Sequence, residues 1–129
     1  MPVPGLVELL ELATARGWPI ALVTNAPRPT VGLMIRSLKV ERWFPESVWS
    51  LGVECEHPKP HPQPYLRGLE LCGGAAAETA LAFEDSPSGV KAAVAAGIRT
   101  VGVLTSQVTL TALLLARART SDASRNTDR

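Results

Sequence analysis

Regular alternation of helix-like and strand-like segments is the feature that most limits what this chain of 129 residues can fold into. Four segments carry apolar residues at helical spacing, and a short apolar run without strict alternation follows each of them. The predicted helices are 5–17, 27–38, 62–73 and 87–97, and the predicted strands are 19–25, 47–53, 79–85 and 99–104. Such strands are typical of a parallel sheet that helices cover on both faces. We therefore predict an α/β, Rossmann-like fold with right-handed crossovers, in which ligands bind beyond the carboxyl ends of the strands.

The chain changes character after Ser106. We assign residues 1–105 to the core domain and residues 106–129 to a divergent tail. In the tail, residues 108–119 (VTLTALLLARAR) predict a short helix, and the polar residues that follow predict disorder. The longest apolar stretch of the tail falls far short of the ~20 residues that a membrane-spanning helix needs.

Charge and cysteine content narrow the class of protein. The formal net charge is +1 and no basic residues cluster, so the sequence predicts neither a nucleic-acid partner nor an anionic membrane surface. Two cysteines without a charged and apolar leader give no sign of a disulfide framework or of secretion. We therefore expect a cytoplasmic protein, with an organelle left open.

Polar residues stand where the first predicted strand ends. Thr24 and Asn25 follow the run PIALV and precede a helix. A hydroxyl beside the free N–H groups of a helix start makes a seat for a phosphate group, because these groups and the helix dipole favour anions. The alternative is that Thr24 or Asn25 only caps the helix.

Two further polar sites occur later in the chain. Lys59 stands between prolines in HPKPHP, so its backbone is stiff and its ammonium suits a phosphate, although a solvated loop lysine is the alternative. Glu84 and Asp85 directly follow an apolar strand, and adjacent carboxylates there can hold Mg²⁺. The alternative for this pair is that Asp85 or Ser86 only caps the next helix.

The order and spacing of these sites resemble a known family. The segments VTNAPR, ECEHPKPHPQPYLRGLE and LAFEDSPSGVKAAVAAGIRTVGV resemble the second, third and fourth motifs of haloacid dehalogenase-like hydrolases. The resemblance covers about residues 4–104 and is fullest to the broad-range sugar-phosphate phosphatases, close to the β-phosphoglucomutase branch. It implies that Thr24 and the backbone of Asn25 bind the transferred phosphoryl group, that Lys59 is catalytic and neutralises this group, and that Glu84 and Asp85 hold Mg²⁺.

The sequence departs from the family at its first motif, an Asp-x-Asp whose first aspartate attacks phosphorus and whose second shuttles a proton. The three aspartates of this chain are Asp85, Asp122 and Asp128, and none forms an Asp-x-Asp pair. The family's cap domain has no counterpart here either. By the resemblance, the missing motif ends the central strand, between the strands that end at Thr24 and Glu84, so we expect two open strand edges inside the sheet. A truncated gene model, a splice form or a fragment would explain this pattern, with a complementing chain or segment supplying the strand.

These observations favour a Mg²⁺-dependent phosphatase core for small phosphorylated metabolites, sugar phosphates by resemblance, which is inactive in the chain as given. One alternative is a non-catalytic phosphate-binding or interaction protein that retains the fold. Phosphoglucomutase or dehalogenase chemistry is the alternative within the superfamily. A receiver domain of a two-component system fits less well, because the chain lacks its early acidic pair and its central aspartate.

Overall fold

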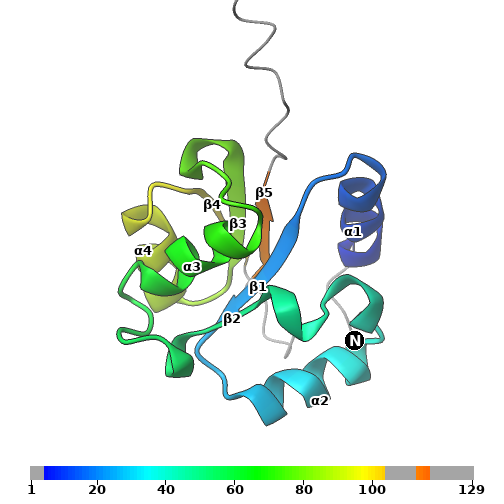
Figure 1. Cartoon of the computed structure of the whole chain (residues 1–129), viewed down its shortest axis with the longest axis horizontal. Coiled ribbons are helices and arrows are strands. Elements are labelled where there is room, and N and C mark those ends of the chain that lie inside the picture. The colour runs from blue at the N-terminus through cyan, green and yellow to red at the C-terminus, as the bar shows by residue number, and fades with distance from the viewer. Residues whose placement is uncertain (1–4, 104–112, 117–129) are drawn as a thin grey trace, which may run out of the picture.

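The computed structural model of the chain describes residues 5–103 and 113–116, and it has the alternating architecture that the sequence predicts (Figure 1). The α-helices are α1 (Leu6–Ala15), α2 (Arg28–Leu38), α3 (Gln63–Leu71) and α4 (Pro87–Ala95). The strands are β1 (Ile20–Thr24), β2 (Trp49–Leu51), β3 (Ala80–Glu84), β4 (Arg99–Gly102) and β5 (Leu113–Ala116). They form one sheet in the order β2-β1-β5-β3-β4.

Local sequence signals explain where the helices begin. Pro29 lies in the first turn of α2, where its missing N–H breaks no intrahelical bond. Ser86 is the N-cap of α4, and its hydroxyl accepts a hydrogen bond of 3.1 Å from the backbone N–H of Gly89. Both positions agree with the helix starts expected from the sequence.

The sheet is parallel except at its centre. β1 pairs in parallel with β2, and β3 pairs in parallel with β4. β5 lies between β1 and β3 and runs antiparallel to both. Figure 1 shows it as the orange arrow in the middle of the sheet. The two strand edges that we expected to be open are therefore paired with a strand from the same chain.

β5 corrects one expectation. The short helix predicted over 108–119 is wrong at Leu113–Ala116, which form a strand; the rest of that segment and of the predicted tail lies outside the described residues. Leucine and alanine are good helix formers, but tertiary context overrides helix propensity, and a strand here gains hydrogen bonds from neighbours on both sides. Part of the predicted tail thus belongs to the core sheet.

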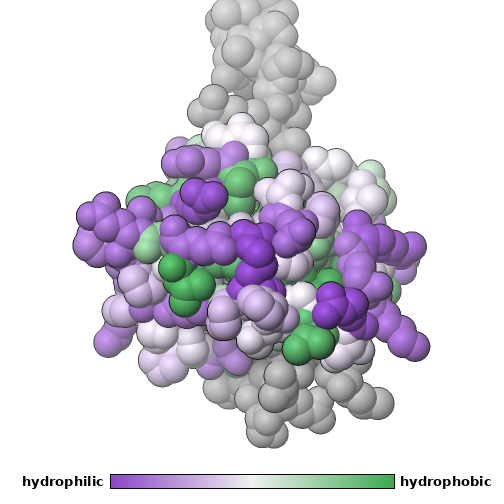
Figure 2. Space-filling model, turned by 60° about the horizontal axis from the view of Figure 1, so that its bottom comes forward, coloured by the Kyte–Doolittle hydropathy of each residue, from purple (hydrophilic) through white to green (hydrophobic). Residues whose placement is uncertain are grey.

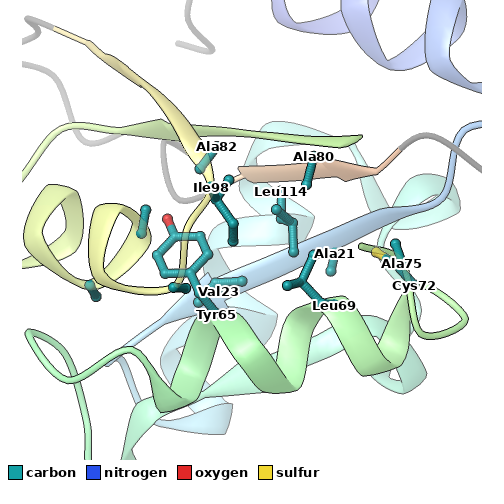
Figure 3. Packing of buried hydrophobic residues seen from close by; sticks show 13 residues of the cluster. Ala21, Val23, Tyr65, Leu69, Cys72, Ala75, Ala80, Ala82, Ile98 and Leu114 are labelled. Carbon is teal, nitrogen blue, oxygen red and sulfur yellow. The ribbon is translucent and has the colours of Figure 1, made fainter. Parts of the chain in front are cut away.

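Two hydrophobic clusters cover the two faces of the sheet. Leu22 of β1 faces a cluster built from α1, α2 and β2, while its neighbours Ala21 and Val23 face a cluster built from α3, α4, β3 and β5. Figure 3 shows the second cluster, in which Leu114 points from β5 toward α3. β1 is buried on both faces, which explains why its sequence is apolar without alternation.

One face of the molecule is largely polar. Figure 2 shows a face on which hydrophilic residues predominate and hydrophobic residues form small, separate patches. Among the helices within the described residues, none is both long and apolar enough to cross a membrane.

Candidate functional site

Lys59 joins the carboxyl ends of the two strands on either side of β5. Its loop precedes α3, and its ammonium donates a hydrogen bond of 2.8 Å to the carbonyl of Val23 in β1. The same ammonium donates to Oε1 of Glu84, the last residue of β3. Lys59 is 8% exposed and Glu84 only 1%. The structure therefore brings these two predicted site residues together as a buried ion pair at the expected edge of the sheet.

Asn25 fixes the backbone of Lys59. Its side-chain amide donates to the carbonyl of Lys59 at 3.2 Å, and its Oδ1 accepts from the N–H of Lys59 at 3.1 Å. This pair of bonds ties the Lys59 loop to the end of β1. From the sequence we expect the backbone of Asn25 as a phosphate ligand or its side chain as a cap, so this clamp is an unexpected feature of the structure. Contact between the Asn25 backbone and phosphate stays a prediction.

Thr24 ends β1 with its hydroxyl in a local turn. Its Oγ1 accepts a hydrogen bond of 3.1 Å from the N–H of Ala26. The hydroxyl is used here as an acceptor, so its own hydrogen is free to donate to an anion. Thr24 is half-buried, and the capping and phosphate-binding interpretations are compatible at this residue.

Tyr65 is a member of the cluster that our sequence analysis missed. Its hydroxyl donates a hydrogen bond of 2.5 Å to Oε1 of Glu84, the oxygen that also accepts from Lys59. The Lys59 ammonium lies 5.2 Å from the centre of the Tyr65 ring. A signal was present, because Tyr65 is the chain's single tyrosine and stands on the apolar face of α3, where a buried hydroxyl needs a partner.

Burial sets the protonation behaviour of this cluster. It lowers the pKa of Lys59, while the charges of Glu84 and Asp85 oppose the shift. It raises the pKa of Tyr65 well above its usual range, and the negative charge of Glu84 adds to that rise. The opposite charge of Glu84 thus offsets part of the cost of burying the Lys59 ammonium.

The other oxygen of Glu84 lies against the start of α4. Oε2 is 3.5 Å from the Ser86 hydroxyl. A Cβ atom added to Gly89 would lie 2.0 Å from this oxygen, so glycine is required for the close approach of helix and carboxylate. Oε2 therefore has one weak side-chain partner, in contrast to Oε1.

Asp85 is exposed at the rim of an open cavity of about 430 Å³, which Glu84 and Lys91 also line. Within residues 5–103 and 113–116, no three metal-ligating side chains of the His, Cys, Asp or Glu type form a group. Mg²⁺ usually takes only one or two protein carboxylates and keeps several waters. Two carboxylates are therefore enough in number for such an ion, and the binding of Mg²⁺ by Glu84 and Asp85 stays a prediction.

Several known proteins are similar to this chain in sequence. A family model described as haloacid dehalogenase-like hydrolase matches residues 1–97. Phosphoglycolate phosphatase of Escherichia coli K12 is 36% identical over 100 residues, which are 78% of this chain and 38% of that protein. A phosphorylated carbohydrates phosphatase of Thermotoga maritima is 38% identical over 98 residues, or 76% of this chain and 44% of that protein.

Solved structures agree with these matches. A crystal structure from Thermotoga maritima, provisionally assigned as a β-phosphoglucomutase, superposes with a TM-score of 0.73 at 37% identity, over 81% of this chain and 48% of that one. A Bacteroides vulgatus protein with the same provisional assignment gives a TM-score of 0.67 at 30% identity, over 81% of this chain and 41% of its own. The chain thus spans less than half the length of each of these four proteins.

Proposed function

Because the chain belongs to the haloacid dehalogenase-like hydrolases, we propose that it forms the phosphate- and metal-binding half of a phosphatase site for small phosphorylated metabolites. The observation that carries this proposal is the Lys59 ammonium, buried between the ends of β1 and β3 and paired with Glu84. An ammonium has three N–H donors, and two of them are used here. The third is available for a phosphate oxygen.

The other residues have complementary roles in this proposal. Thr24 donates its hydroxyl to the phosphoryl group, and the backbone N–H groups beside Asn25 add to the same seat. Glu84 and Asp85 hold Mg²⁺, which, when bound, would offset the negative charge of the phosphate oxygens. Asn25 keeps the Lys59 loop in register with this seat.

Sugar phosphates are the proposed substrates. The names of two similar proteins, phosphoglycolate phosphatase and phosphorylated carbohydrates phosphatase, support a phosphatase of small phosphorylated compounds.

The cytoplasm is the proposed location. Both cysteines are free in the structure, in keeping with a reducing compartment.

We further propose that the chain as given does not turn over substrate. The sequence has no Asp-x-Asp motif. Asp85 does not replace it, because it follows β3 rather than the central strand and is proposed as a metal ligand. Positioning and charge stabilisation accelerate phosphoryl transfer only when a nucleophile is in place. A non-catalytic phosphate-binding protein is the second candidate, because Thr24 and Lys59 keep donors that need no nucleophile to bind an anion.

The test is release of phosphate from a panel of sugar phosphates, with and without Mg²⁺. This chain is compared with a version extended upstream by an Asp-x-Asp segment, and Lys59→Met is compared with Lys39→Met, an exposed lysine, in both backgrounds. We expect Mg²⁺-dependent release in the extended form alone, lost in Lys59→Met and kept in Lys39→Met. Release by the short chain would contradict its inactivity. Silence of both forms, with binding of inorganic phosphate that Lys59→Met abolishes, would favour the non-catalytic candidate.

A further inference from the structure

Arg28 is held on three sides at the start of α2. Its Nε and Nη2 donate hydrogen bonds of 3.0 and 2.7 Å to the two carboxylate oxygens of Glu54, and its Nη1 donates one of 3.0 Å to Glu46. The guanidinium also lies 5.5 Å from the centre of the Trp49 ring. Hydrogen bonds from Arg28 lower the pKa of Glu54, so the pair stays charged over a wider range of pH. We call Arg28, Glu46 and Glu54 the arginine bridge.

The arginine bridge joins two segments that lead away from neighbouring strands. Arg28 is the first residue of α2, which follows β1. Glu54 is the last residue of a 3₁₀ helix (Gly52–Glu54) that directly follows β2. The last residues of β1 and β2, Thr24 and Leu51, pair with each other. Both segments therefore start at the edge of the sheet where the candidate site lies (Figure 1).

The 3₁₀ helix packs against Asn25 through Gly52. A Cβ atom added to Gly52 would overlap Asn25 Oδ1 and would lie 3.2 Å from Pro58 Cβ, so backbone and side chain are in close contact here. The same Oδ1 accepts the hydrogen bond of 3.1 Å from the N–H of Lys59. A shift of the 3₁₀ helix therefore changes the space in which Asn25 holds the backbone of Lys59.

The arginine bridge restricts position more than it adds stability. The side chains of Arg28, Glu54 and Glu46 are 41%, 42% and 67% exposed, and exposed ion pairs contribute little to folding. A bidentate pair is nevertheless restricted in direction, because the planar fork of a guanidinium fits one arrangement of the carboxylate. We therefore expect loss of the bridge to loosen the 3₁₀ helix without unfolding the chain.

We propose that Arg28 is a positioning residue for Lys59. It holds the 3₁₀ helix through Glu54, the helix packs against Asn25, and Asn25 binds the backbone of Lys59. The Lys59 ammonium is thereby kept at the phosphate seat. The importance of this placement rests on the proposed function, whereas the contacts that lead from Arg28 to the Lys59 backbone need no phosphate.

The first experiment measures how fast the backbone amide hydrogen of Lys59 exchanges with solvent, by NMR of the full chain. Arg42→Met is the matched control for Arg28→Met, because Arg42 also pairs with a glutamate, Glu11 of α1, and lies 3.9 Å from the centre of the Trp43 ring. We expect exchange to be at least about three-fold faster in Arg28→Met and unchanged in Arg42→Met. Arg28→Lys should be intermediate, because an ammonium cannot form the bidentate pair. Equal exchange in all four proteins would overturn the proposal.

Salt and a second substitution test the path itself. The Debye length falls from about 10 Å at 0.1 M salt to about 3 Å at 1 M, so salt weakens the exposed bridge. Exchange at Lys59 should accelerate with salt in the unsubstituted chain and not in Arg28→Met. The double variant Arg28→Met/Glu54→Gln should exchange no faster than Arg28→Met, since both changes break one interaction. A further increase would show that Glu54 acts without Arg28 and would overturn the path.

The last experiment connects position with binding. The affinity for inorganic phosphate in the presence of Mg²⁺ is measured by phosphorus NMR, beside the urea midpoint of each variant. We expect Arg28→Met to bind phosphate at least about three-fold more weakly, with a midpoint close to that of Arg42→Met. Faster exchange at Lys59 with unchanged phosphate affinity would overturn the positioning role.

Failure of the proposed function would look different. If the unsubstituted chain binds no phosphate, the phosphate seat is contradicted, and the exchange rates still support or overturn the placement of Lys59 by Arg28. If Arg28→Met does not fold, its exposure of 41% makes the arginine bridge a larger part of stability than we propose, which counts against the inference. Arg28→Lys and the salt response of the unsubstituted chain then decide whether Lys59 depends on the bridge.

Discussion

Among single residues, Glu84 decides how the buried cluster behaves, because Lys59 and Tyr65 both donate to its Oε1. A buried ion pair adds little net stability, since taking both charges out of water costs about as much as their attraction returns. Losing one partner is different, because the remaining charge stays buried without compensation. The cluster is therefore sensitive to single substitutions and tolerant of paired ones.

This sensitivity predicts a strong non-additivity. We expect Lys59→Met to lower the free energy of unfolding by about 3–5 kcal/mol, because it leaves the Glu84 carboxylate buried and uncompensated. Glu84→Gln should also destabilise, while the double variant should lose clearly less than the sum of the two. Urea unfolding followed by tryptophan fluorescence measures all three, and Lys39→Met should stay within about 0.5 kcal/mol of the unsubstituted chain. Additive losses would show that the two side chains do not interact.

Tyr65 predicts a pH dependence of stability. Its pKa is raised in the folded chain, so above about pH 10 the unfolded chain loses the phenol proton while the folded chain keeps it. The unfolded state then binds fewer protons, and stability falls with rising pH by about 1.4 kcal/mol per pH unit from this group. Below about pH 10 both states keep the proton and the contribution is constant.

The near-ultraviolet absorbance of tyrosinate checks this directly, because the chain has one tyrosine. We expect no tyrosinate signal above pH 10 until the chain unfolds, and then a signal that rises together with loss of circular dichroism. The unfolding free energy of Tyr65→Phe should lack the slope due to this group. A normal titration in the still folded chain would show that Tyr65 is accessible to water.

The residues of the cluster differ in how far the sequence could reveal them. Lys59 and Glu84 were predictable because prolines and a strand end mark them in the chain. The clamp by Asn25 was not, since it joins positions 34 residues apart and depends on how two loops meet. Tyr65 is an intermediate case. The sequence indicates that it lies on the buried face of a helix, but not that its hydroxyl donates to Glu84.

At the scale of elements, the start of α4 lies close against the end of β3 because Gly89 has no side chain. Gly89→Ala would place a carbon 2.0 Å from Glu84 Oε2, so the helix or the carboxylate has to move. We expect a loss of about 1–3 kcal/mol in the free energy of unfolding, as for other overpacked positions. Gly102→Ala is the matched control, because a Cβ atom there meets nothing within 4 Å and φ is not positive. Chemical denaturation of both variants gives the comparison, and equal stabilities would mean that α4 shifts freely.

The elements also show what a sequence pattern can and cannot settle. Four helices and four strands follow from periodicity and from end signals such as Ser86, because these signals are local. β5 does not, because the run that contains Leu113–Ala116 has the composition of a helix. Its conformation is decided by β1 and β3, which are distant in the chain and need a partner between them.

At the scale of the whole molecule, one sheet joins two hydrophobic clusters whose unfolding can be followed separately. Tryptophan fluorescence reports on one cluster and the reactivity of a thiol on the other. Trp49 belongs to the cluster of α1 and α2, and Trp18 and Trp43 pack against it. Cys72 belongs to the cluster of α3 and α4, where burial raises the pKa of its thiol to about 11. Since alternate residues of β1 belong to the two clusters, neither can lose its packing without disturbing the other.

We therefore predict a single cooperative transition. In a Cys55→Ser background, which leaves Cys72 as the one thiol, the urea midpoint from tryptophan fluorescence should coincide with the midpoint from thiol labelling. The labelled fraction is read after a short pulse, because the protonated, buried thiol of the folded chain reacts slowly. Weakening β5 by Leu114→Ala should lower both midpoints together, since β5 links β1 to β3. Separation of the two midpoints, with Cys72 exposed first, would show instead that the half of the sheet beyond β5 unfolds on its own.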